Sequence, residues 1–117
     1  MNFATKLAAV GGAVLLATTL AVSAESMVTN MKGMTLYTFD NDAGGKPTCE
    51  GDCAKIWPPY AGLAGENFGE GWTLVPRADG TLQWAYDTKP VYFFVKDTKA
   101  GEMLGDGVKG IWHVIKE

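Results

Sequence analysis

The sequence has little of the residue chemistry on which most enzymes and zinc sites depend. Its 117 residues include one histidine, His113, and two cysteines, Cys49 and Cys53. A catalytic nucleophile must lie within reach of a base, and His113 has no Ser or Cys partner in a recognisable motif. A Cys-x3-Cys pair without partner histidines is not a zinc site. The sequence therefore predicts a protein that is not an enzyme.

Positive charge is also scarce. The chain has 10 Lys and Arg residues against 13 Asp and Glu residues, a net charge of -3 at pH 7. Proteins that bind nucleic acid neutralise its phosphates with Lys and Arg, so this balance argues against a nucleic-acid partner. At 117 residues, 47% hydrophobic and 20% charged, the chain has the composition of one globular domain.

The first 24 residues have the pattern of a secretory signal peptide. A short charged segment precedes an uncharged run over 7–22, and the pattern ends in Val-Ser-Ala24, a small-x-small cleavage site. A membrane anchor is the alternative, since such a run approaches the roughly 18 to 20 residues that cross a bilayer. The Ala, Gly and Thr content and the charged Glu25 favour cleavage after Ala24. We expect an exported domain, 25–117, with no stable membrane anchor.

Both cysteines belong to the exported part. Export makes a disulfide available, and an internal bridge between Cys49 and Cys53 is the simplest pairing. A loop of roughly five residues contributes only about 2 kcal/mol in the chain-entropy model, so the bridge is expected to hold a local turn. A redox-active pair is the alternative, which would need a strained, exposed bridge.

An internal repeat appears when the chain is compared with itself at an offset of 55 residues. The matching positions are aromatic or acidic: Leu36-Tyr37-Thr38-Phe39 with Val91-Tyr92-Phe93-Phe94, Asp42 with Asp97, and Ile56-Trp57 with Ile111-Trp112. We therefore predict two pseudo-repeats, 30–60 and 85–117, joined by a hairpin segment, 61–84.

Short β-branched and aromatic runs between turn residues predict an all-β fold. The expected strands cover 26–29, 34–40, 72–76, 81–86, 90–95 and 110–116. The Asp79-Gly80 pair is short hairpin-turn chemistry. A helical turn near 51–57 must stop before Pro58 and Pro59. The prediction is a small antiparallel sheet or sandwich of about six short strands with that one helical turn.

Two motifs of the form Tyr-x-aromatic-x-x-Asp begin at Tyr37 and Tyr92. They stand with Cys49-x-Gly-x-Cys53-Ala, Trp57-Pro-Pro, Asp79-Gly-Thr-x-Gln-Trp84 and Asp106-Gly-x-x-Gly-x-Trp112-His113. As a set, over 33–115, these motifs resemble the uncharacterised secreted-repeat or predicted-lipoprotein family of bacteria. The resemblance implies an exported bacterial protein of paired repeats and supplies no catalytic residues. Because no cysteine follows the signal for lipidation, a soluble periplasmic or secreted state is favoured.

The repeated aromatic and acidic residues are interpreted as structural. Burying one aromatic ring contributes about 2 to 3 kcal/mol, and the repeat places rings at equivalent positions. The acids are expected to cap turns by accepting backbone N–H bonds. The residues given a structural or motif role are Tyr37, Phe39, Asp42, Trp57, Trp84, Tyr92, Phe94, Asp97 and Trp112.

Four other aromatic residues lie outside the duplicated pattern or on loops: Tyr60, Phe68, Trp72 and Phe93. They are the better candidates for an aromatic platform that binds a flat or cationic ligand.

A metal site is the competing chemistry. The soft or imidazole donors outside the cysteines are Met27, Met31, Met34, Met103 and His113. Thioether ligands select copper(I), but Met also fills gaps in cores, and His113 suits a sheet position beside Trp112. We predict no cofactor, with copper as the alternative.

The sequence thus predicts an exported, non-catalytic binding or envelope-associated module. Its partner would be a protein or small molecule of the cell envelope. The alternative is a periplasmic copper or thiol-redox protein that uses Met, His or Cys ligands.

Overall fold

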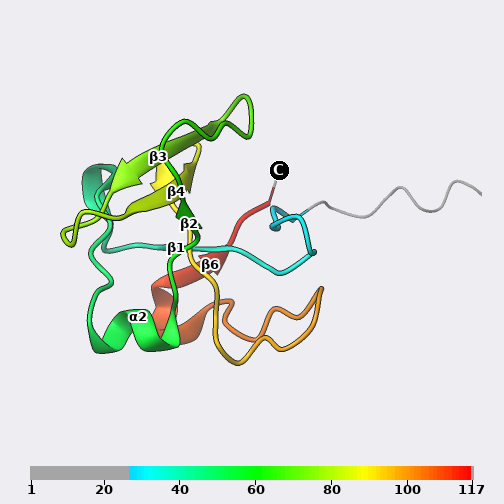
Figure 1. Ribbon diagram of the computed structural model, residues 1–117. Coiled ribbons are helices and arrows are strands. Elements are labelled where there is room, and N and C mark those ends of the chain that lie inside the picture. Colours follow the sequence, from blue (N-terminus) through cyan, green and yellow to red (C-terminus); the bar gives the residue numbers. More distant parts are fainter. Residues whose placement is uncertain (1–26, 117) are drawn as a thin grey trace, which may run out of the picture.

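The computed structural model describes residues 27–116 and is an all-β domain, as the sequence predicts (Figure 1). Its elements in chain order are β1 (Tyr37–Phe39), η2 (Ala43–Gly45), α2 (Asp52–Ile56), β2 (Ala61–Gly62), β3 (Trp72–Pro76), β4 (Leu82–Tyr86), β5 (Lys89–Pro90), η3 (Val108–Gly110) and β6 (Trp112–Val114). Figure 1 shows the β3–β4 hairpin at one end of the domain and α2 at the other.

The hairpin is the longest regular element. Its strands β3 and β4 pair antiparallel from Trp72–Tyr86 to Pro76–Leu82, and β2 and β5 add to β4. The turn follows from Asp79, whose carboxylate accepts the Thr81 amide at 2.9 Å and the Thr81 hydroxyl at 2.6 Å. The hydroxyl contact is the main cause of the lowered pKa of Asp79. The predicted hairpin is therefore confirmed.

A second sheet pairs the start of one repeat with the end of the other. Strand β1 runs antiparallel to β6, with Tyr37 opposite Val114 and Phe39 opposite Trp112. Both strands are shorter than predicted. The predicted strand over 110–116 starts late because Gly110, with φ of 71°, is the last residue of η3, and a positive φ lies outside the extended region.

The predicted strand over 90–95 is wrong as a continuous element. Only Pro90 lies in a ladder, within β5, and Tyr92 makes isolated bridges to Tyr37 on one side and Pro59 on the other. The strand stops early because the Asp97 amide bonds to the Phe94 carbonyl at 3.0 Å, closing a turn. At the N-terminal end, Thr29 bridges Thr35 as expected, whereas Met27 bridges Lys116.

The single α-helix of the described residues is short and lies where the sequence predicts it. Helix α2 ends with the Trp57 amide bonded to the Cys53 carbonyl at 2.8 Å, directly before Pro58. Cys49 and Cys53 form the predicted disulfide, with Cα atoms 5.2 Å apart. Cys49 is fully buried, so the bridge fastens the start of α2 to the core.

Backbone hydrogen bonds reproduce the 55-residue repeat in three dimensions. Tyr37 and Tyr92 exchange both of their backbone bonds, each at 2.9 Å. The Asp40 amide bonds to the Ile111 carbonyl at 2.9 Å, and the equivalent Val95 amide bonds to Ile56 at 3.0 Å. An approximate two-fold relation therefore passes between the two tyrosines.

Candidate functional site

The two Tyr-x-aromatic-x-x-Asp motifs meet by exchanging partners. The Tyr37 hydroxyl donates to Asp97 at 2.5 Å, and the Tyr92 hydroxyl donates to Asp42 at 2.7 Å. Each tyrosine therefore depends on the acid of the other repeat.

Each acid also holds its own loop, in the manner expected of a turn cap. Asp42 accepts the Thr48 amide at 2.8 Å, and Asp97 accepts the Leu104 amide at 2.9 Å. The sequence reasoning missed the tyrosine partners. The available signal was that a buried tyrosine hydroxyl needs a hydrogen-bond partner, and the motif supplies one acid for each tyrosine.

Burial and these contacts keep both hydroxyls protonated. Desolvation is the larger cause and the hydrogen bond to Asp97 the next cause of the raised pKa of Tyr37. The pKa of Tyr92 is raised in the same way by burial and then by Asp42. Both side chains are fully buried, so a ligand in solvent does not reach them.

Four aromatic rings form a continuous stack beside the two tyrosines. Trp57 and Trp112 are parallel, with centroids 3.9 Å apart. Phe94 stacks on the outer face of Trp57 at 4.2 Å, and Phe39 stacks on Trp112 at 4.1 Å. We call this set the closed core: Tyr37, Phe39, Trp57, Tyr92, Phe94 and Trp112.

One glycine permits that packing. A Cβ atom on Gly105 would lie 2.6 Å from the Trp57 ring, a distance that side chains do not tolerate. The Gly105 amide also donates to the Tyr37 hydroxyl at 3.1 Å. The backbone therefore replaces a side chain where the ring and the hydroxyl converge.

A second aromatic group gathers at the hairpin and is open to solvent. Tyr60 lies 5.1 Å from Phe93, and Phe68 lies 5.4 Å from Trp72, measured between ring centroids. These are the four aromatic residues that the sequence offered as a platform. The cavity beside them has a volume of about 320 Å³ and is lined by Thr29, Asn30, Met31, Tyr60, Phe68 and Trp72. We call it the aromatic pocket.

The loop after β2 positions Phe68 over the hairpin. Glu66 accepts the Leu63 amide at 2.7 Å, and Asn67 accepts the Gly69 amide at 2.7 Å. Gly69 has φ of 100°, a conformation open to glycine. Phe68 is thereby stacked on Trp84 at 3.9 Å, yet it stays 39% exposed.

The structure separates the candidate metal ligands. Met27 and Met103 line one pocket with Asp106, whereas Met31 lines the aromatic pocket. Met34 is half-buried, and its amide bonds to the Asn30 side chain at 2.9 Å. Among residues 27–116, no group of three or more His, Cys, Asp or Glu side chains is arranged to hold a metal ion.

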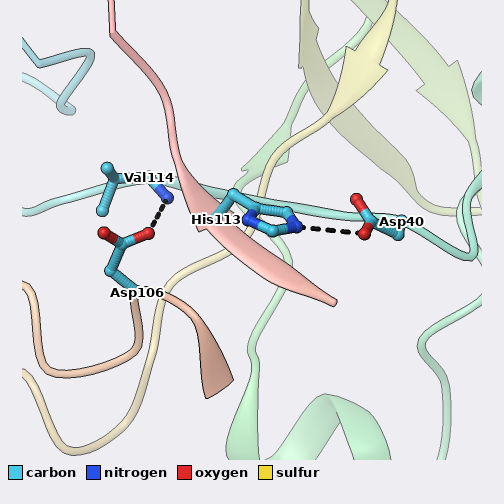
Figure 2. Close-up of polar contacts among 4 residues, drawn as sticks. All are labelled: Asp40, Asp106, His113 and Val114. Carbon is cyan, nitrogen blue, oxygen red and sulfur yellow. Dashed lines mark hydrogen bonds and ion pairs between the residues drawn. The ribbon is translucent and has the colours of Figure 1, made fainter. Parts of the chain in front are cut away.

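His113 lies on β6 and bonds to an acid of the neighbouring segment. Its Nε2 atom is 3.0 Å from Asp40, and both side chains are about half exposed. Figure 2 shows the ring directed toward Asp40 and away from Asp106, which accepts the Val114 amide at 3.1 Å. The imidazole is therefore paired with Asp40 on the sheet and lies in a different pocket from the methionines.

A buried arginine was not foreseen from the sequence. Arg77 donates to the Gln83 side chain at 2.6 Å and to the Cys49 carbonyl at 2.8 Å. Gln83 in turn donates to the Val91 carbonyl at 2.9 Å. Glu50 lines the pocket beside Arg77, and it would repel an anion there. Arg77 thus ties the hairpin to the disulfide loop.

These features define the class of protein: a small all-β domain of two cross-paired units, with an aromatic pocket beside the intervening hairpin. Residues 19–61 and 73–116 each match the model of a family described as "secreted repeat of unknown function". The two matches cover most of the chain, which therefore belongs to this secreted-repeat family, as its motifs implied. No curated protein and no solved structure matches the chain.

Within residues 27–116, no helix has the length and apolar character needed to cross a bilayer.

Proposed function

We propose that this protein is an exported, non-catalytic binding module and that the aromatic pocket is its ligand site. The observation that carries the proposal is the meeting of Tyr60, Phe68 and Trp72, from three segments of the chain, around one opening. Small-molecule sites are concave and lined mainly by apolar and aromatic side chains. The pocket has both properties, and it lies outside the cross-paired motifs.

Partial exposure of large rings supports this assignment. Phe68 is 39% exposed although it stacks on buried Trp84. The apolar side chain of Met31, which lines the same pocket, is 91% exposed. Exposed apolar patches on small soluble proteins commonly mark binding surfaces. The ligand would be a small molecule of the cell envelope with a flat or apolar body.

The environment of the reactive side chains favours a non-catalytic role. The single histidine of the chain bonds to Asp40 on the sheet. The two thiols are joined, and the Cys49 sulfur lies in the buried core, which argues against a redox pair that must meet a partner. We further propose a periplasmic or secreted location after cleavage following Ala24, which the family description as a secreted repeat supports.

Titration of the mature protein with small flat aromatic molecules tests the proposal. Tryptophan fluorescence and the indole N–H signal of Trp72 should change saturably, and Phe68→Leu should weaken binding at least about fivefold, the loss of about 1 kcal/mol of ring contact. Ile56→Ala removes an exposed apolar side chain on α2 and is the control, with unchanged binding. If no compound binds saturably, the pocket is not a ligand site.

The copper alternative has one observation in its favour. Met27 and Met103 line a common pocket with Asp106, and thioether sulfur favours copper(I). Native mass spectrometry of the exported protein, compared with its denatured and non-reduced mass, separates the two accounts. The binding-module account expects no metal in the native state, whereas a retained copper-sized adduct lost in Met103→Leu would establish copper carriage. The denatured mass also reports whether cleavage follows Ala24.

A further inference from the structure

We infer that the aromatic pocket selects organic cations, meaning ligands that carry a quaternary or protonated nitrogen on an apolar body. The inference rests on the proposed function, because it names the class of ligand for the same pocket. It starts from the lining, in which three rings and the Met31 thioether surround a cavity of about 320 Å³. Aromatic faces attract cations through the ring quadrupole.

The loop that carries two of the rings adds negative charge. Residues 61–76 include Glu66 and Glu70 and contain neither Lys nor Arg. Glu66 is fixed in place, because its carboxylate accepts the Leu63 amide at 2.7 Å. It is also close enough to Tyr60 to act on the hydroxyl: burial is the first cause, and Glu66 the second, of the raised pKa of Tyr60.

The rest of the lining, Thr29, Asn30 and Met31, is neutral, and the Asn30 side chain is already hydrogen-bonded. The Asn30 side-chain oxygen accepts the Lys32 amide at 3.0 Å and the Met34 amide at 2.9 Å. Lys32 follows Met31 in the chain but is not one of the residues that line the cavity. A bound cation would thus meet ring faces, a thioether and the field of Glu66.

An anionic ligand is disfavoured by the same charges. It would meet the negative faces of the rings, and the charge of Glu66 acts on Tyr60 of the lining. Neither Glu66 nor Lys32 itself lines the cavity. A neutral aromatic ligand would gain the apolar contacts but not the electrostatic attraction. The predicted order of affinity is therefore cation, neutral molecule, anion, for ligands of equal shape.

The test uses a matched pair of probes, (4-hydroxyphenyl)trimethylammonium and its neutral counterpart 4-tert-butylphenol, followed through the Trp72 indole N–H signal. We expect the cation to bind about fivefold more tightly. Glu66→Gln should reduce that ratio to about twofold or less while leaving the neutral probe unchanged. The carboxamide oxygen introduced by this substitution can still accept the Leu63 amide, so the loop is kept. Glu50→Gln, at the Arg77 pocket, is the control and should leave the ratio unchanged.

The outcomes separate the inference from the function on which it rests. Raising the salt concentration from about 50 to about 500 mM should weaken the cation more than the neutral probe, and this needs no variant. Equal affinity for the two probes in low salt would overturn the selection of cations while leaving a ligand pocket. Binding of neither probe would overturn both.

Discussion

The two aromatic groups of this domain are built from similar residues but differ in closure. In the closed core, Trp57 and Trp112 stack at 3.9 Å and are almost fully buried. In the aromatic pocket, Phe68 also stacks at 3.9 Å, on Trp84, but it is 39% exposed. Stacking distance therefore does not distinguish the two groups of rings, whereas burial does.

The difference follows from symmetry. Each ring of the closed core has an equivalent in the other repeat, so the two units cover each other. Phe68 and Trp72 belong to the hairpin segment between the repeats, Tyr60 directly precedes it, and this segment has no second copy to cover it. The segment that breaks the repeat is the one that leaves aromatic surface open.

The largest difference between the two groups should appear on truncation. Phe94→Ala should lower the free energy of unfolding by about 3 to 5 kcal/mol, because Phe94 is 7% exposed and stacks on Trp57. A domain this small would then have little stability left. Chemical denaturation checks the loss. An unchanged denaturation midpoint would show that the closed core is not the main source of stability.

The exchanged hydrogen bonds should have the next largest effect. Tyr37→Phe keeps the ring but leaves the buried Asp97 oxygen without its donor, at a cost of about 1 to 3 kcal/mol. Tyr86→Phe, on the hairpin, is the matched control and should change stability by less than about 0.5 kcal/mol. Urea titration of both variants measures the difference. Equal effects would mean that the exchange between repeats adds nothing.

Removal of the disulfide, which packs beside the closed core, sharpens the comparison further. The paired change Cys49→Ser and Cys53→Ser should cost about 2 kcal/mol and weaken folding without abolishing it. Arg77 still bonds to the carbonyl of residue 49, which keeps the loop on the hairpin. Thermal melting of the reduced wild type gives the same information. Complete unfolding on reduction would show that the bridge has a larger role than a local turn.

The smallest expected effect is a loss of folding stability at alkaline pH, caused by ionisation of the two core tyrosines. Burial raises the pKa values of Tyr37 and Tyr92 above their ordinary value of 10.0. Tyrosines of the unfolded chain ionise first, so the stabilisation is complete below about pH 10 and is lost as pH rises through the folded-state pKa. The urea midpoint should fall above about pH 10, less steeply in Tyr92→Phe. A pH-independent midpoint across that range would contradict the buried, protonated state.

The sequence was sufficient for the elements with strong local signals. The Asp79-Gly80 turn predicted the β3–β4 hairpin, Pro58 and Pro59 ended the helix, and the 55-residue offset predicted equivalent aromatic positions. Three of the four candidate platform residues line the pocket, and the fourth, Phe93, lies 5.1 Å from Tyr60. In each case the information sits within a few neighbouring residues or in a comparison of the chain with itself.

Long-range pairing was not accessible in the same way. A periodic pattern shows that Tyr92 is buried, but it does not show that its hydroxyl bonds to Asp42, 50 residues away. Likewise, Arg77 is a charged residue that follows a strand at the start of a turn, where the sequence favours an exposed side chain. In the structure it is buried and donates to Gln83. The prediction of a strand over 90–95 failed because Tyr92 pairs through single bridges and a turn closes between Phe94 and Asp97.

The most direct test of the account is thermal melting of Phe68→Ala with and without 4-tert-butylphenol. Because Phe68 is partly exposed, the variant should lose about 1 kcal/mol and melt within about 8 °C of the wild type. The ligand should raise the melting temperature of the wild type, since it binds only the folded state, and should leave Phe68→Ala unchanged. A loss of stability as large as that of Phe94→Ala, or an undiminished ligand-induced rise in the variant, would contradict the account.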